Sequence, residues 1–285
     1  MSNLVKLQLG STKHWNVYAH SFLYFGINLA RERGGARIIH HADAVARRID
    51  EGHESKTGSY YNPCLPGGFS ANFTSKIHFS DGIESWKSHS VVGKDAAPYT
   101  VVFYGGESSG DFEKCHDVTV EILRLESNAW CNFSHGGDCS FAGIYQPPVP
   151  AQSPHFGEFF GLANYHTFWS FADLPLKSTV GEVKAKAQEI CSMSYSALKE
   201  YNHKRLAKRG KKKIKPDDDD DLETYCFLAT YSYSMLSKGY GFSDSANITV
   251  ASIINGQKVG WALGSALYEI VSMSALKMKA RVNAR

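Results

Sequence analysis

Apolar and polar positions along the chain follow two periodicities. Residues 99–104, YTVVFY, are a run of β-branched and aromatic side chains typical of a buried strand. In residues 20–33, Phe22, Phe25 and Leu29 fall on one face of a helix. The same patterns predict further strands at residues 6–9, 15–18 and 248–254, and further helices at residues 36–49, 112–125, 156–171, 179–208, 222–238 and 260–271.

Strands and helices mix along the chain without an internal repeat, which is typical of an α/β fold. Thr179 and Glu182 are spaced as a capping box and mark a helix start. A break is predicted at Gly34-Gly35, between two helical segments. The loop GGESSG, residues 105–110, is a candidate phosphate cradle but lacks the Lys and Ser/Thr of a P-loop. We therefore interpret it as a connector between a strand and a helix.

Six cysteines bear on the compartment, since an even number allows complete pairing. Cys131 and Cys139 enclose the polar, turn-forming segment NFSHGGD. A disulfide loop, free buried thiols and a metal site are the three interpretations. The segment favours a disulfide, because its glycines can reverse the chain and because zinc ligands are usually spaced more closely.

Three triplets match the N-glycosylation pattern, at Asn72, Asn132 and Asn247. Paired cysteines and glycosylation both favour the extracellular space or the lumen of the secretory pathway. The start, MSNLVKLQLG, is too polar for a signal peptide, so we expect an incomplete or processed N-terminus, with a membrane anchor upstream of Met1 as one option. No apolar run in the sequence is long enough for a transmembrane helix.

Net charge and motifs exclude some classes of function, and the sequence does not fix the oligomeric state. A formal net charge of +3 gives no field that would attract nucleic acid. Aspartates 217–221 follow a lysine-rich stretch, and a solvated loop is favoured there over a cation site. No established catalytic motif occurs. His40, His41 and Asp43 are interpreted as surface residues, and His20 as a core histidine.

Six stretches resemble the ecto-apyrases, the nucleoside triphosphate diphosphohydrolase family, in the same order and close to the family's spacing. They are WNVYAHSFLYFG, NPCLPGG, GESSGDFEKC, CSFAGIYQPP, TYCFLATYSYSMLSKGYGF and GQKVGWALGSALY. The resemblance implies an actin/sugar-kinase-like (ribonuclease-H-like) α/β lobe, incomplete at its N-terminus. Residues 1–242 would be the C-terminal lobe, and residues 243–285 would return to the absent N-terminal lobe. It also implies the disulfides Cys64–Cys115, Cys131–Cys139 and Cys191–Cys226.

The implied function is hydrolysis of nucleoside tri- and diphosphates to lower phosphates, with Ca²⁺ or Mg²⁺ bridging the phosphates. The family's phosphate loops and its catalytic Glu would precede residue 1. We therefore expect no catalytic residue and no metal ligand in this chain, and no activity from it alone. The alternatives are a secreted, catalytically silent module that binds a nucleotide or a protein, and a cytosolic protein with free thiols.

Nucleobase contact is the part of the function that the resemblance assigns to this chain. It places Ala163, His166 and Tyr225 at base-contacting positions, with His166 where Tyr or Phe is usual. Asp221 and Ile27 replace basic residues of the family. For Tyr225 the alternative is packing of a helix beside a disulfide. The resemblance leaves open the preferred base and the preference between di- and triphosphates.

Overall fold

The structure is a computed structural model, and it describes residues 4–9, 13–18, 25–49, 58–77, 79–80, 83–84, 98–123, 139–141, 144–145, 159–211, 215, 219–254 and 257–258. Its helices are α1 (Ile27–Ile49), α2 (Phe112–Leu123), α4 (Asn164–Phe171), α5 (Val180–Cys191), α6 (Tyr195–Lys208), the 3₁₀ turn η4 (Leu222–Thr224), α7 (Tyr225–Ser234) and the π-helix η5 (Met235–Gly239). Its strands are β1 (Leu4–Leu9), β2 (Lys13–Tyr18), β3 (Ser59–Tyr61), β4 (Ser70–Ser75), β5 (Phe79–Ser80), β6 (Ile83–Glu84), β7 (Tyr99–Tyr104), β8 (Cys139–Ser140), β9 (Ile144–Tyr145), β10 (Phe159–Gly161), β11 (Lys177–Thr179), β12 (Asn247–Val250), β13 (Ile253–Ile254) and β14 (Gln257–Lys258).

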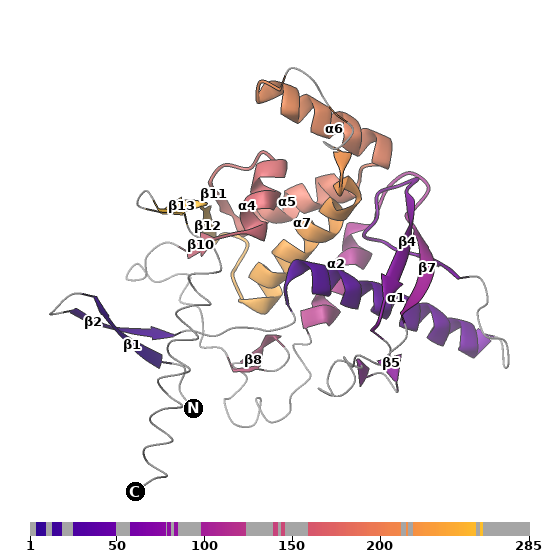
Figure 1. The fold of residues 1–285 in the computed structure, drawn as a ribbon, viewed down its shortest axis with the longest axis horizontal. Coiled ribbons are helices and arrows are strands. Elements are labelled where there is room, and N and C mark those ends of the chain that lie inside the picture. Colours follow the sequence, from indigo (N-terminus) through magenta and orange to yellow (C-terminus); the bar gives the residue numbers. More distant parts are fainter. Residues whose placement is uncertain are drawn as a thin grey trace, which may run out of the picture.

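Helices and small mixed sheets together make an α/β protein (Figure 1). Two sheets of the described part have three strands, in the orders β3-β7-β4 and β10-β12-β11. In each sheet one pair is parallel and the other antiparallel. The strands predicted at residues 6–9 and 15–18 lie within β1 and β2, which pair as an antiparallel hairpin. β12 lies in the segment assigned to residues 243–285, yet it pairs with β10 and β11 of the preceding segment.

Two of the predicted helices differ from the structure. Residues 159–161 are strand β10, so the helix predicted over residues 156–171 begins only at Asn164. The helix predicted from Thr179 to about residue 208 is two helices, α5 and α6, which are separated at residues 192–194. The start of α6 is fixed there by a second cap, in which the Ser194 side chain accepts a hydrogen bond from the amide of Ala197. The capping box of Thr179 and Glu182 is present as predicted.

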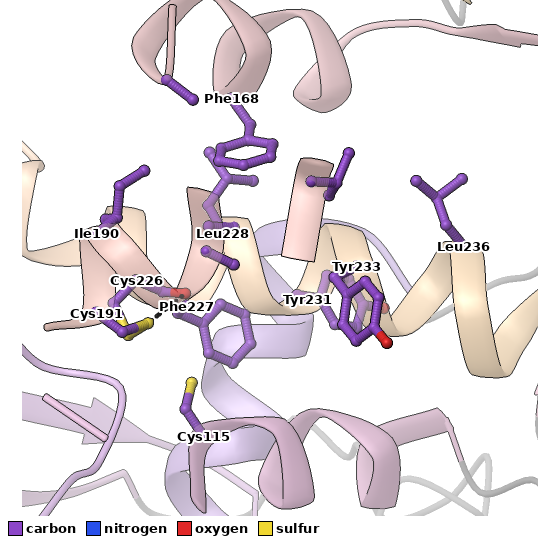
Figure 2. Packing of buried hydrophobic residues seen from close by; sticks show 14 of the residues in the cluster. Cys115, Phe168, Ile190, Cys191, Cys226, Phe227, Leu228, Tyr231, Tyr233 and Leu236 are labelled. Atoms are coloured by element: carbon purple, nitrogen blue, oxygen red, sulfur yellow. Dashed lines mark hydrogen bonds between the residues drawn. A yellow bond between two sulfur atoms is a disulfide. The ribbon is translucent and has the colours of Figure 1, made fainter. Parts of the chain in front are cut away.

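The core is centred on α7, whose residues from Cys226 to Ser234 are all buried. This helix packs against α2, α4 and α5. Figure 2 shows α7 between Phe168 of α4 and Cys115 of α2. The helix is buried on every side, as expected for a helix enclosed by others, although it includes the polar residues Thr230, Ser232 and Ser234. In the described part of the chain, no helix combines the length and apolar composition needed to cross a bilayer.

Helix α1 runs without interruption through Gly34-Gly35, so the predicted break is wrong. At these two glycines, neighbouring elements approach α1 closely. A Cβ on Gly35 would lie 2.4 Å from the ring of Phe73 on β4, and one on Gly34 would lie 3.2 Å from Ile122 on α2. Close packing therefore offsets the cost of roughly 1 kcal/mol that each glycine adds to a helix interior. Next to them, Arg33 is fully buried and donates to the Ile122 carbonyl oxygen at 2.9 Å.

Candidate functional site

Two of the predicted base-contacting residues lie at the start of α4. Ala163 immediately precedes the helix and has φ 53° and ψ −111°, and its side chain provides no cap. Its carbonyl oxygen still accepts a hydrogen bond from the amide of Thr167 at 3.1 Å, which begins the helical ladder. His166 is half-buried in the first turn. An alanine with positive φ is strained, and such strain is concentrated at functional sites.

The third residue, Tyr225, begins α7 and contacts the opposite end of α4. Its ring stacks on Phe171, the last residue of α4, with a centroid distance of 3.6 Å and an interplanar angle of 18°. Burial raises the pKa of the Tyr225 phenol, so the hydroxyl stays protonated near neutral pH. The structure therefore places Ala163 and His166 at one end of an eight-residue helix and Tyr225 at the other.

Helix α6 also contacts Phe171. The Arg205 guanidinium carbon lies 5.1 Å from the centroid of the Phe171 ring, and the Tyr201 hydroxyl donates to the Phe171 carbonyl oxygen at 3.2 Å. Arg209 donates to the carbonyl oxygen of Ser170 at 2.6 Å and to Asp173 at 2.8 Å. These contacts fix the end of α4 and with it the ring on which Tyr225 stacks.

Asp219 extends this support into the aspartate run. Both of its carboxylate oxygens lie 3.0 Å from Nε2 of His203, and Oδ1 accepts from the Asn202 amide at 3.3 Å. Asn202 in turn accepts from Arg205 at 2.8 Å. The sequence does not indicate this network, because Asp219 lies 16 and 17 residues from the partners it joins in α6. Within α6, the closely spaced Asn202, His203 and Arg205 are the only feature of the sequence that points to this network.

Asp221 and Ile27, the two positions at which the resemblance implies that a basic residue is replaced, have different surroundings. Asp221 is exposed and left-handed, with φ 60°, and its carbonyl oxygen accepts from the Thr224 hydroxyl at 2.7 Å. Ile27 opens α1, is half-buried and packs against the core. The replacements therefore put a carboxylate within four residues of Tyr225 and an apolar side chain at the start of α1.

Two disulfides, Cys64–Cys115 and Cys191–Cys226, are present in the structure and are pairs that the resemblance implies. All four cysteines are buried. Cys191–Cys226 joins the end of α5 to the residue after Tyr225 and so holds the start of α7 in place (Figure 2). Cys131 and the side chain of Cys139 lie outside the described residues.

The GGESSG loop connects β7 to α2, as predicted, and its glycines pack against protein backbone. A Cβ on Gly105 would lie 2.2 Å from the carbonyl oxygen of Pro66, and one on Gly110 would lie 2.7 Å from that of Leu65. The partner loop contributes Gly67, where a Cβ would lie 2.1 Å from the backbone of Ser108. Close contact between the two loops accounts for these glycines without a phosphate.

The remaining candidate residues have structural partners or lie outside the described residues. His41 and Arg37 both contact Oε2 of Glu121 at 2.9 Å, and Asp43 accepts a hydrogen bond from Tyr60. Burial raises the pKa of Glu121, but the hydrogen bonds and charges of His41 and Arg37 outweigh burial and lower it. His20 is outside the described residues.

Two of the three glycosylation candidates lie among the described residues, and the search for a metal site covers the same residues. Asn72 on β4 and Asn247 on β12 are both exposed, whereas Asn132 lies outside the described residues. Within the described ranges, no three His, Cys, Asp or Glu side chains converge as a metal site would require. We therefore assign no residue of these ranges to a cation.

Comparison with known proteins decides the family. The profile of the GDA1/CD39 (nucleoside phosphatase) family matches residues 2–284. The chain belongs to this family. The resemblance recognised in the sequence is thereby confirmed, because the match covers nearly the whole chain.

Individual relatives in the GDA1/CD39 family are distant and considerably longer. Ectonucleoside triphosphate diphosphohydrolase 1 of Bos taurus is 25% identical over 256 residues, which are 88% of this chain and 42% of the relative. Ectonucleoside triphosphate diphosphohydrolase 2 of Gallus gallus is 26% identical over 253 residues, or 88% and 43%. Probable apyrase 3 of Arabidopsis thaliana is 25% identical over 262 residues, or 90% and 45%. The chain thus spans less than half the length of these relatives.

Proposed function

We propose that this chain is the nucleobase-binding lobe of an apyrase-type enzyme that hydrolyses nucleoside tri- and diphosphates outside the cell or in the secretory lumen. The observation that carries the proposal is the family match over residues 2–284. The names of the relatives, diphosphohydrolases and apyrases, supply the reaction. Two buried disulfides support an oxidising compartment. In this proposal residues 1–242 form an actin-like lobe, and residues 243–285 return to the other lobe.

The chain spans less than half the length of its relatives, which supports a proposal in which base contact and catalysis lie in different parts of the protein. Phosphoryl transfer requires positioning of the phosphates and neutralisation of their charge, which the family is expected to achieve with Ca²⁺ or Mg²⁺. As the family resemblance implies, the proposal assigns the ion and the groups that activate water to residues outside these 285, and the base contact to residues within them.

The geometry around α4 and α7 supports the proposed base contact. Tyr225 presents a ring that is held rigidly by Phe171, and a base can stack on a ring that is held in this way. His166 offers a second, smaller ring at the other end of α4, where Ala163 is exposed. Stacking on one aromatic side chain contributes roughly 1–3 kcal/mol per base.

Titration calorimetry with a non-hydrolysable ATP analogue tests the base contact. We expect Tyr225→Leu to weaken binding roughly tenfold or more, because the stacking surface is lost. Tyr225→Phe is the matched control, since it keeps the ring and should change affinity little. His166→Tyr should tighten binding, because it enlarges the second ring. Equal affinity for Tyr225→Leu and the parent chain would remove Tyr225 from the site, provided that thermal melting shows both to be folded.

A phosphate-release assay tests whether catalysis requires residues outside these 285. The purified 285-residue chain, given ATP or ADP with Ca²⁺, is expected to release no phosphate above background. Steady turnover would show that the catalytic groups lie within these residues.

A further inference from the structure

The sheet of β3, β7 and β4 covers α1 with one face and leaves the other face to solvent. Phe103 and Tyr60 are buried on the α1 side, where Tyr60 donates a hydrogen bond to Asp43. On the opposite face, Val102 and Tyr104 in the central strand β7 are 38% and 43% exposed. We call this second face the outer face. Exposed apolar side chains in the centre of a sheet, beside an edge strand such as β4, favour association with other chains unless they are covered.

Asn72 lies in the middle of the outer face. In the β4–β7 register it is directly opposite Val102, and Thr74 is opposite Thr100. Alternate residues of a strand share one face, so Asn72 and Thr74 point outward together. Both are exposed, and Thr74 Oγ1 lies 2.9 Å from Thr100 Oγ1, which fixes its orientation. The two polar groups of the Asn-Phe-Thr triplet are therefore presented side by side to solvent.

We propose that Asn72 carries an N-linked glycan whose first sugars lie across Val102 and Tyr104. The inference rests on the secretory location in the proposed function. In the modification, the Asn72 side-chain nitrogen forms a bond to the anomeric carbon of a lipid-linked oligosaccharide diphosphate. The bond from that carbon to the diphosphate breaks, the lipid diphosphate leaves, and the amide loses one proton.

The surroundings of Asn72 suit a carbohydrate in both apolar and polar character. Tyr104 neighbours Tyr61 of β3, with ring centroids 6.1 Å apart, so two aromatic rings adjoin Val102 on the outer face. Strands lie about 4.8 Å apart and alternate residues about 6.8 Å apart, which places Tyr61 about 12 Å from Asn72 and within reach of the first sugars.

Beyond Tyr61, the outer face ends in a polar cavity of about 520 Å³. Its lining includes Glu107, Ser108, Asp111 and Gln188. Carboxylates, hydroxyls and an amide can all accept or donate hydrogen bonds to sugar hydroxyls. An apolar bed that leads to a polar cavity is the arrangement that a sugar chain with apolar faces and polar edges would fit.

Mapping of the modified residue is the first test. The 285-residue chain, fused to a cleavable secretion signal, is expressed in a eukaryotic host, and its glycans are released by an amidase in heavy-oxygen water. We expect mass spectrometry to find labelled aspartate at position 72. Thr74→Ala should abolish the label, whereas Thr74→Ser, the matched control, should keep it. Secreted chain with unmodified Asn72 overturns the proposal.

Exposure of the outer face is the second test, read by fluorescence of the apolar dye ANS. Native deglycosylation or Asn72→Gln should raise dye fluorescence, and Val102→Thr with Tyr104→Thr should remove the increase. Asn247→Gln, which removes an exposed triplet on the other sheet, should leave fluorescence unchanged. Deglycosylation of the parent chain gives the answer even if a variant fails to fold. Equal fluorescence before and after deglycosylation would show that the sugars do not cover Val102 and Tyr104, which overturns this part of the proposal.

The two proposals fail separately. Chain that binds nucleotide but has unmodified Asn72 contradicts only this inference. Chain that carries the Asn72 glycan on the outer face but does not bind nucleotide contradicts only the base-binding function.

Discussion

At the scale of single residues, backbone strain coincides with the candidate base site. Among the described residues, three other than glycine have positive φ: Ala163, Asp173 and Asp221. Ala163 precedes α4, and Asp221 precedes the turn that leads to Tyr225. Asp173 follows α4 and is held by Arg209 at 2.8 Å. Such conformations persist only where their surroundings enforce them, so each of these positions is fixed by its neighbours.

Glycine at position 163 should relieve this strain. Because glycine adopts φ 53° without a Cβ clash, Ala163→Gly is expected to raise the free energy of unfolding by about 1 kcal/mol. Urea denaturation measures the change. Ala197→Gly in α6 is the matched control, since Ala197 is helical and glycine there should lower stability by up to about 1 kcal/mol. A loss of stability in both variants would contradict the strain at Ala163.

The sequence predicted the positions of the candidate site through family resemblance, but it did not predict their surroundings. Tyr225 could be named because it lies in one of the six stretches that resemble the family, and Ala163 and His166 because their positions match base-contacting positions of the family. The stack of Tyr225 on Phe171 and the support from Arg205 depend on how α4, α6 and α7 pack. No local pattern records that packing, and no propensity predicts a positive φ at an alanine.

At the scale of elements, one glycine joins three segments. The Gly67 amide donates to the Met193 carbonyl oxygen at 3.4 Å, and its carbonyl oxygen accepts from the Tyr195 amide at 2.9 Å. Its α-carbon lies against the backbone of Ser108. The loop before β4, the loop after β7 and the α5–α6 turn therefore meet at a position that has no room for a side chain.

Substitution at this junction should be costly. Gly67→Ala places a Cβ 2.1 Å from a backbone carbon, and we expect a loss of about 3 kcal/mol or more, because backbone cannot move aside as a side-chain tip can. The midpoint of urea unfolding measures it. Gly26→Ala, where no atom lies within 4 Å of the new Cβ, should change stability by less than about 1 kcal/mol. Similar effects at the two positions would refute the close approach.

Elements were predicted well where the local pattern agrees with the packing. YTVVFY and the helix after it were predicted because apolar periodicity and tertiary environment point the same way. The break at Gly34-Gly35 was wrong because contacts with Phe73 and Ile122 override the low helix propensity of glycine. Strand β10 was missed because its three residues are too few to show an alternating pattern.

At the scale of the whole molecule, the two described disulfides tie peripheral elements to the buried core. Cys64–Cys115 closes a loop of 51 residues that contains β4 and β7, two of the three strands of the sheet with the outer face. Cys191–Cys226 closes a loop of 35 residues that contains α6 and the charged stretch. A closed loop restricts the unfolded chain, so both bridges raise stability through the unfolded state.

Removal of either bridge should destabilise the fold strongly. For loops of this length the chain-entropy relation gives about 4 kcal/mol each, so Cys64→Ser with Cys115→Ser, and Cys191→Ser with Cys226→Ser, should each lose about that much. Urea unfolding of the two double variants measures the loss. Because all four sulphurs are buried, mild reductant should leave the bridges of the folded chain intact. Rapid reduction without denaturant would contradict that burial.

The Cys191–Cys226 bridge also affects how the chain tolerates breakage. Any peptide bond between these two cysteines can be hydrolysed without separating the resulting fragments, because the sulphur–sulphur link still joins them. The span includes the lysine-rich and aspartate-rich stretch, whose basic residues are the preferred targets of trypsin-like proteases. Digestion there would leave α7 covalently attached to α5. On a denaturing gel without a thiol the cleaved chain would still run as one band, and after a thiol is added it would run as two.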